Sequence, residues 1–315
     1  MSFELIGQGR GDQSDVAAHP DGRTIGVVRP FRGVELLDVS GASRSTAWAD
    51  PSLLVTSLHF LPDGARAVSN GFETSAWLWD LASGELIRDL VWRDAGGPTL
   101  DALSPDGAEL VLTDELGNAA LLDVESGALI RQWRALMPHL PLPAFHRPAS
   151  GASSGTNLVT FGVDAGPSVV RVLETRTGRL VHEVAFEGRT GSTRAALSAD
   201  ERRLVASVSD GSGATLLVHD LADRTTQVLG TREGFVHRLV LHPDGRHALT
   251  SGAPDRAISV WDLVRPGVSA ELVGPQRGGV GRGFALLPDG AAVVSATDDG
   301  FVCRWSLPSA ASPVR

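Results

Sequence analysis

The chain has 315 residues and a net charge of −9, and its 28 basic residues are all arginine. The acidic balance argues against a nucleic acid as the main partner, and a single cysteine excludes an internal disulfide. No stretch approaches 18 consecutive apolar residues, and the N-terminus lacks a secretory pattern, so we expect no membrane span and a cytoplasmic location. The absence of lysine is typical of codon bias in a GC-rich bacterial genome.

The first predicted element is a short apolar strand at residues 3–6, which has no repeat unit of its own. The last unit of the chain stops after its third strand, at Trp305. We therefore expect the N-terminal strand to complete that unit and close a ring, which leaves no long exposed sheet edge. Burial of Phe3 and Leu5 would then stabilise the fold by about 1.5 to 3 kcal/mol each.

Seven repeat units follow, and five of them have a tight Pro-Asp-Gly turn after an apolar strand. The aspartates of these turns are Asp21, Asp63, Asp106, Asp244 and Asp289, with a degraded copy at Asp200. They recur at intervals of about 42 to 45 residues, except that Asp106 and Asp200 are about twice 47 residues apart, so one turn is missing near Pro148. The most regular units predict strands at 55–60, 67–70, 77–80 and 86–91, and at 100–103, 109–113, 119–123 and 129–133. This repeat predicts an all-β, seven-bladed β-propeller with four antiparallel strands in each blade.

The fourth unit is longer than the others because residues 134–156 add loops rich in proline and small residues. Loops on a rigid scaffold often carry recognition, so we expect this insertion to influence partner specificity. The units leave no room for a second domain. Residues 1–307 are expected to form one propeller, and residues 308–315 a flexible tail.

Two predicted third strands end in Trp-Asp, at Trp79-Asp80 and at Trp261-Asp262, and with this dipeptide the chain resembles the WD40-repeat family. In that family a Trp, a second-strand Ser, a loop Asp and the histidine of a Gly-His dipeptide form a hydrogen-bonded set. The Gly-His dipeptide is absent from this chain. The resemblance implies the rest of the set at Ser251, Asp255 and Trp261, and again at Ser295, Asp299 and Trp305.

The resemblance also implies that the loops entering each blade share one face, called here the entry face, and that the Pro-Asp-Gly turns lie on the opposite turn face. Six of the seven entry loops carry arginine, whereas aspartates gather on the turn face. An arginine-edged entry face could receive an acidic peptide or a phosphate, although such charges are also common on solvated loops. The residues expected to contact a partner are Arg10, Arg93, Arg134, Arg189, Arg232, Arg277 and Arg282, with Trp48 and Trp92 as exposed anchors.

Three further patterns have simpler interpretations. Ser153 lies in a G-x-S-x-G sequence, but without the strand-to-helix context of a hydrolase, so we expect a flexible turn. His242 and His247 flank a turn and could approach one another, but two histidines make a poor metal site. Cys303 lies in an apolar strand and is expected to be a core residue.

The resemblance implies a non-catalytic scaffold or adaptor, without a cofactor, that binds a protein partner through the entry face. Two alternatives stay open. One is a small-molecule-binding or catalytic propeller that uses its central channel, where the first strands supply mostly Ala, Val, Leu and Ser. The other is an accessory subunit of a larger bacterial effector or signalling complex.

Overall fold

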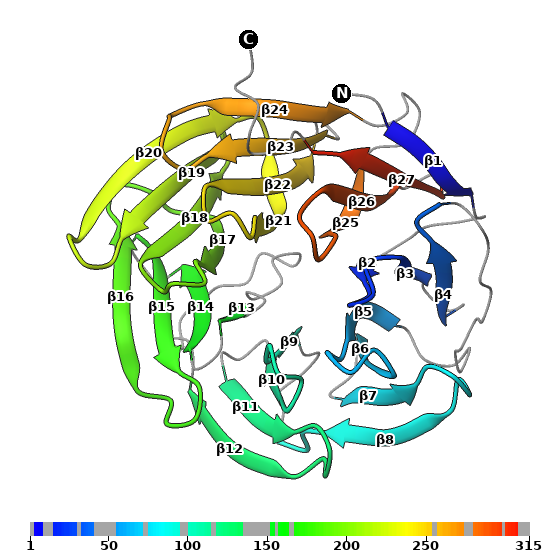
Figure 1. Ribbon diagram of the computed structural model, residues 1–315. Helices are drawn as coiled ribbons and strands as arrows, with labels where there is room; N and C mark the ends of the chain where they lie inside the picture. The colour runs from blue at the N-terminus through cyan, green and yellow to red at the C-terminus, as the bar shows by residue number, and fades with distance from the viewer. Residues whose placement is uncertain are drawn as a thin grey trace.

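The computed structural model describes residues 3–8, 15–29, 33–40, 55–71, 75–94, 100–114, 118–134, 152–154, 157–163, 167–253, 257–273, 280–297 and 300–307. Every regular element in these ranges is a β-strand, and the strands form antiparallel sheets arranged as a ring (Figure 1). Six sheets have four strands and one has three. The protein is therefore a β-propeller with six complete blades, and the prediction of four strands in all seven blades is wrong for the remaining sheet, as far as the described residues go.

The sheets are numbered here in chain order. Sheet 1 is the three-stranded one, with β2 (Asp15–Ala18), β3 (Thr24–Arg29) and β4 (Gly33–Asp38). Sheet 2 contains β5 (Val55–Phe60), β6 (Arg66–Gly71), β7 (Ser75–Asp80) and β8 (Leu86–Val91). Sheet 3 contains β9 (Leu100–Leu103), β10 (Glu109–Thr113), β11 (Asn118–Asp123) and β12 (Leu129–Arg134). Sheet 4 contains β13 (Ala152–Ser154), β14 (Asn157–Val163), β15 (Ser168–Glu174) and β16 (Leu180–Phe186).

The remaining three sheets follow the same order from the axis outward. Sheet 5 contains β17 (Ser192–Leu197), β18 (Arg203–Asp210), β19 (Gly213–Asp220) and β20 (Thr225–Arg232). Sheet 6 contains β21 (Phe235–Leu241), β22 (His247–Ala253), β23 (Ala257–Asp262) and β24 (Val268–Val273). Sheet 7 contains β25 (Val280–Leu286), β26 (Ala292–Thr297), β27 (Phe301–Ser306) and β1 (Phe3–Gln8).

The predicted ring closure is confirmed, because β1 pairs antiparallel with β27, from Phe3 opposite Trp305 to Gln8 opposite Phe301. The expected burial of the first strand is wrong in detail. Phe3 and Leu5 are 38% and 53% exposed, whereas Ile6 is 5% exposed and packs into the core between sheets 7 and 1. Alternate side chains of a strand point to opposite faces, so only one side of β1 meets the neighbouring sheet.

The apolar core of the propeller lies between sheets rather than within them. Among the described residues there are seven buried clusters, and each joins two sheets that are neighbours in the ring. One cluster, for example, places Trp77 of sheet 2 against sheet 1, where Gly26 leaves room for the side chains of Leu58 and Phe60. Every sheet is thus held from both sides, which makes the ring a rigid frame for its loops.

Burial differs systematically between the strand positions. Second and third strands such as β18, β19, β23 and β26 are buried, whereas the fourth strands β8, β20 and β24 are largely exposed. Strand β4 is buried almost throughout, as third strands are. Within the described residues β4 is nevertheless an edge strand of sheet 1.

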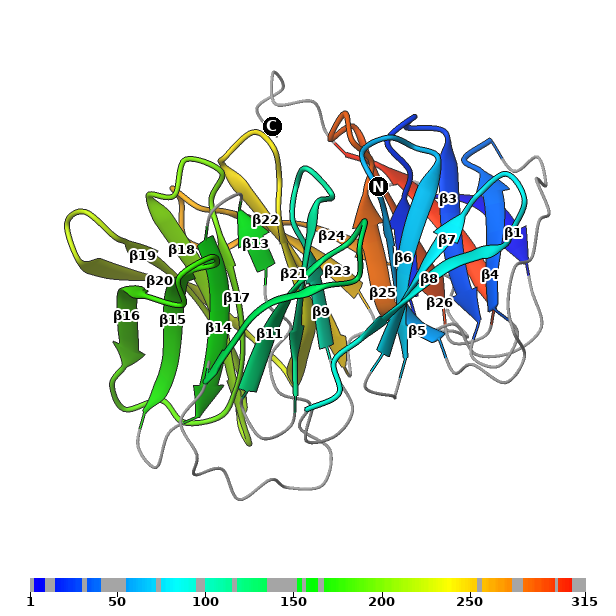
Figure 2. The ribbon, with the colours of Figure 1, turned by 90° about the horizontal axis from the view of Figure 1, so that it is seen from below.

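The tight turns lie at one end of the sheets and the entry loops at the other, as the edge-on view shows (Figure 2). In the Pro-Asp-Gly turns a glycine adopts a left-handed conformation, with φ between 65° and 73° at Gly22, Gly64, Gly107, Gly245 and Gly290. The degraded turn of sheet 5 keeps this geometry with Glu201, at φ 56°. Arg224, at φ 54°, likewise stands where three other third-to-fourth-strand turns have glycine.

The stretch expected to be a loop in the fourth unit contains a strand. β13, at Ala152–Ser154, pairs with β14 and is the first strand of sheet 4. Ser153 therefore lies in a β-strand and not at the strand-to-helix turn that a hydrolase nucleophile requires. The other residues of the 134–156 insertion lie outside the described residues, except Arg134 at the end of β12.

Candidate interaction site

Four of the arginines predicted to contact a partner, Arg93, Arg134, Arg189 and Arg232, follow or end outermost strands, at the end opposite the Pro-Asp-Gly turns. Arg93 is exposed directly after β8, Arg189 lies between β16 and β17, and Arg232 ends β20. For Arg134 and Arg282 only the backbone is described, in β12 and β25. Three predicted contact residues lie outside the described ranges: Arg10, Arg277 and Trp48.

Two of these arginines donate hydrogen bonds to the sheet that follows the outermost strand before them. Nη1 of Arg189 donates to Oγ1 of Thr215 at 2.7 Å, and Nη1 of Arg232 donates to Oγ1 of Thr250 at 3.3 Å. Both arginines are half-buried. Their guanidinium groups thus help to hold the sheet ends together, whereas Arg93 remains an exposed charge.

The Trp-centred hydrogen bonds of the WD40-repeat type are present, but with a different second-strand residue in sheet 6. Nε1 of Trp261 donates to Oγ1 of Thr250 at 2.9 Å, and Nε1 of Trp79 donates to Oγ of Ser69 at 2.8 Å. Ser251 is buried and its hydroxyl has no partner among the described residues, so its expected role is wrong. Because Ala248 pairs with Trp261, the residue two positions further, Thr250, points to the same side of the sheet.

Arg232 adds a second hydrogen bond to this set in sheet 6. Thr250 accepts from both Trp261 and Arg232, so the hydroxyl joins the third strand to the entry loop. In sheet 7 Trp305 and Ser295 are buried as expected, but within the described residues neither side chain has a hydrogen-bond partner. Asp255 and Asp299 lie outside the described residues.

Trp92 is a core residue and not an exposed anchor. It is 2% exposed, lies in the cluster between sheets 2 and 3, and donates from Nε1 to Oε1 of Gln132 at 3.2 Å. The expectation that it is exposed is therefore wrong. Sequence reasoning missed the apolar residues that the entry face does expose at sheet 6: Phe235, which is 42% exposed, and Val273, which is 58% exposed.

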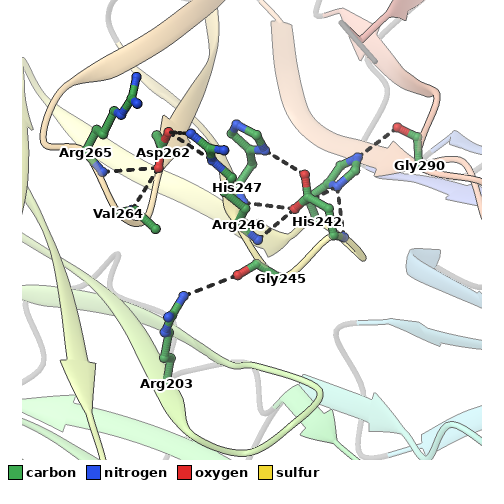
Figure 3. A network of polar contacts seen from close by, with 10 residues as sticks. Arg203, His242, Gly245, Arg246, His247, Asp262, Val264, Arg265 and Gly290 are labelled. Carbon is green, nitrogen blue, oxygen red and sulfur yellow. Dashed lines mark hydrogen bonds and ion pairs between the residues drawn. The ribbon is translucent and has the colours of Figure 1, made fainter. Parts of the chain in front are cut away.

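The acidic residues of the turn face are engaged in the turns themselves. Oδ1 of Asp244 accepts from the backbone amides of Arg246 and His247, and its Oδ2 lies 2.7 Å from Nδ1 of His247 (Figure 3). Burial works to raise the pKa of Asp244, but the hydrogen bonds, with His247 first, outweigh it and lower the pKa to about 2. Arg246 in turn pairs with Asp262 at 2.8 Å. The turn face therefore carries arginines beside its aspartates, and is not simply acidic as expected.

Histidines connect neighbouring turns across sheet boundaries. Nδ1 of His242 accepts from the amide of Asp244 at 3.1 Å, so its Nε2 carries the proton and donates to the Gly290 carbonyl at 2.9 Å. His19 makes the same pair of contacts, with Asp21 and Gly64. The predicted approach of His242 and His247 is confirmed, with ring centroids 6.2 Å apart. The described residues contain no group of three side chains able to hold a metal ion.

The inner strands carry charges that the sequence interpretation overlooked. Arg238 of β21 forms an ion pair with Asp15 of β2, and its guanidinium lies 5.9 Å from the ring centroid of Phe284 in β25. Cys303, by contrast, is buried in the core as expected. The described part of the chain contains no helix that is long and apolar enough to cross a membrane.

A ring of antiparallel sheets in which two third strands, β7 and β23, end in Trp-Asp and donate from the tryptophan to a second-strand hydroxyl is typical of a WD-type β-propeller. The family model described as "WD domain, G-beta repeat" matches residues 224–262, which covers β20 to β23. The chain is 29% identical over 248 residues to Transducin beta-like protein 3 of Rattus norvegicus, a match that covers 75% of this chain. Both matches support a WD40-repeat family. The chain spans only 29% of the length of that relative.

Proposed function

We propose that this protein is a non-catalytic scaffold that binds a protein partner through its entry face. The observation that carries the proposal is the closed set of seven inter-sheet clusters, which holds the sheets rigid and leaves the loops as the variable surface. The similarity to WD40-repeat proteins supports the same role. A fold alone does not decide a function, so the surface must be tested directly.

The entry face offers both charge and apolar surface to such a partner. Arg93 is exposed after β8, and Phe235 exposes 42% of its surface at the start of β21. Aromatic and arginine side chains are the usual centres of binding energy in protein interfaces. We therefore place Phe235 in the anchoring role first assigned to Trp92, with an acidic segment of the partner facing the arginines.

We also infer that sheet 1 is the seventh blade of the propeller. Strand β2 packs against both β25 of sheet 7 and β5 of sheet 2, and buried clusters join sheet 1 to both neighbours. A blade in this position keeps the platform closed, which suits a cytoplasmic scaffold or an accessory subunit of a larger bacterial complex.

The proposal is tested by reversing charge on one face at a time. The entry-face variant carries Arg10→Glu, Arg93→Glu and Arg282→Glu, which leaves Arg189 and Arg232 to hold their sheets. The matched control makes the same change in charge on the turn face, at the exposed residues Arg23, Arg202 and Arg224. We expect the tagged entry-face variant to lose the proteins that the natural protein co-purifies from its host, and the control to keep them. Equal retention by both variants would remove the entry face as the binding surface.

A further inference from the structure

Two of the innermost strands, β21 and β5, are partly exposed. In β21 Phe235 and His237 are exposed and residues 238–241 are half-buried, whereas every residue of β23 in the same sheet is buried. Strand β5 has the same character, with half-buried residues at Thr56, Ser57 and His59. These are the innermost strands of their sheets, and they lie nearest the centre of the ring (Figure 1).

The inner strands carry equivalent residues at one level of the ring, that is, at the same distance along the strand from the tight turn. In each sheet considered, the amide of the first turn residue donates to the carbonyl five positions later, as at Ser198, His242 and Leu287. The residue four positions before this first turn residue is equivalent from sheet to sheet. They are Asp15 in sheet 1, Ser57 in sheet 2, Arg194 in sheet 5, Arg238 in sheet 6 and Gly283 in sheet 7.

Arg238 already binds a carboxylate at this level. Its Nη1 donates to Asp15, which belongs to a sheet two places further around the ring and has a side chain only 8% exposed. Asp15 lies close against Gly283 of β25, in the sheet between those of Asp15 and Arg238. A Cβ atom added at Gly283 would lie 2.6 Å from Cα of Asp15 and 2.8 Å from its Oδ1. The Arg238 side chain remains 32% exposed, and within the described residues its Nε and Nη2 have no hydrogen-bond partner. One side of the guanidinium is therefore available to a second oxyanion.

Arg194 supplies a second guanidinium from the adjacent strand β17, which packs against β21. Its Nε donates to the carbonyl of His237 at 3.1 Å and its Nη1 donates to the carbonyl of Thr193 at 2.9 Å. These bonds hold the arginine in one orientation, so little side-chain entropy is lost when an anion binds. Arg194 and Arg238 thus bring two guanidinium groups to neighbouring inner strands, and Arg238 is the one that the structure pairs with the carboxylate of Asp15.

We propose that the inside of the ring binds the oxyanion group of a small ligand, a carboxylate or a phosphate, between Arg194 and Arg238. The planar guanidinium group can donate two parallel hydrogen bonds to either oxyanion. The carboxylate of Asp15 already accepts one hydrogen bond from Arg238 and so competes with the ligand for this arginine. This site is separate from the entry-face surface and does not depend on a protein partner. It fits the channel alternative of the sequence interpretation, because charged side chains converge on the axis.

The test is isothermal titration calorimetry of the full chain with two probes, inorganic phosphate and citrate, which distinguish the two oxyanions. We expect at least one probe to bind, and Arg194→Gln and Arg238→Gln each to weaken that binding about tenfold or more. Arg93→Gln, which removes an exposed arginine outside the ring, is the matched control and should bind as the natural protein does.

Two outcomes would overturn the proposal. One is that neither probe binds, and the other is that Arg194→Gln binds with unchanged affinity. Arg194→Gln is decisive because it leaves the Asp15–Arg238 ion pair intact, so its fold does not depend on that pair. Asp15→Asn should bind the probe more tightly, because the competing carboxylate is removed. Weaker binding by an Asp15→Asn variant that is folded by circular dichroism would equally contradict the competition.

Discussion

The closure of the ring by β1 predicts a sharp difference between two adjacent residues. Ile6 is 5% exposed and packs in the cluster between sheets 7 and 1, whereas Leu5 is 53% exposed on the other side of the strand. Ile6→Ala removes three buried carbon atoms and leaves a cavity, which typically costs about 2 to 4 kcal/mol. Leu5→Ala removes a similar volume from a surface already in contact with water and should cost well under 1 kcal/mol.

The expected melting shifts follow from the size of the chain. An unfolding entropy of about 2.1 cal/mol/K per residue gives about 0.66 kcal/mol/K for the whole chain. Ile6→Ala should then lower the Tm by about 3 to 6 °C, and Leu5→Ala by less than about 1.5 °C. Differential scanning calorimetry measures both under identical conditions. Equal shifts for the two variants would refute the orientation of β1, and no shift for either would refute its role in closure.

Three further predictions concern sheets 5 and 6. Thr250→Val removes the acceptor of two hydrogen bonds and should destabilise the protein by about 1 to 3 kcal/mol in urea unfolding. Ser251→Ala should be neutral or stabilising, because that buried hydroxyl has no partner among the described residues, and a larger loss at Ser251 would contradict the assignment. Glu201→Gly and Arg224→Gly should each stabilise by about 1 kcal/mol, because glycine adopts their left-handed conformation without strain; lower melting temperatures would show that the side chains compensate. Burial lowers the pKa of His219, helped by His182 and opposed by Asp220, so the unfolded chain takes up its proton first as the pH falls. Stability should thus decrease below pH about 7, and His219→Asn should flatten that part of a pH series of urea unfolding curves.

The repeat architecture could be predicted because its signals are local. Asp21 and its equivalents cap their own turns through backbone amides two and three residues later, so the Pro-Asp-Gly tripeptide specifies the reversal wherever it occurs. Alternating apolar residues on either side of such a turn specify antiparallel strands. The ring closure followed as well, since a last unit with three strands and an unassigned N-terminal strand complement one another.

The candidate site could be predicted only in part, because side-chain direction depends on register. A shift of one position moves a side chain to the opposite face of a strand, which is why Thr250 and not Ser251 meets Trp261. Ile6 and Leu5 differ for the same reason: as neighbours in a strand they point to opposite faces, and only Ile6 faces the core. Composition at these positions does not distinguish the two faces, since both candidates at each site are chemically suited to the role.

Contacts between sheets were beyond the reach of the sequence. Trp92 is buried because sheet 3 covers it, and nothing in its own segment distinguishes that packing from exposure on the entry face. Asp15 and Arg238 are 223 positions apart and meet only because the ring returns the first sheet to the side of the last. By itself the sequence determined the units and their turns, which depend on neighbouring residues; the tertiary structure decided which charges are neutralised and which remain available, because that depends on the sheet packed alongside.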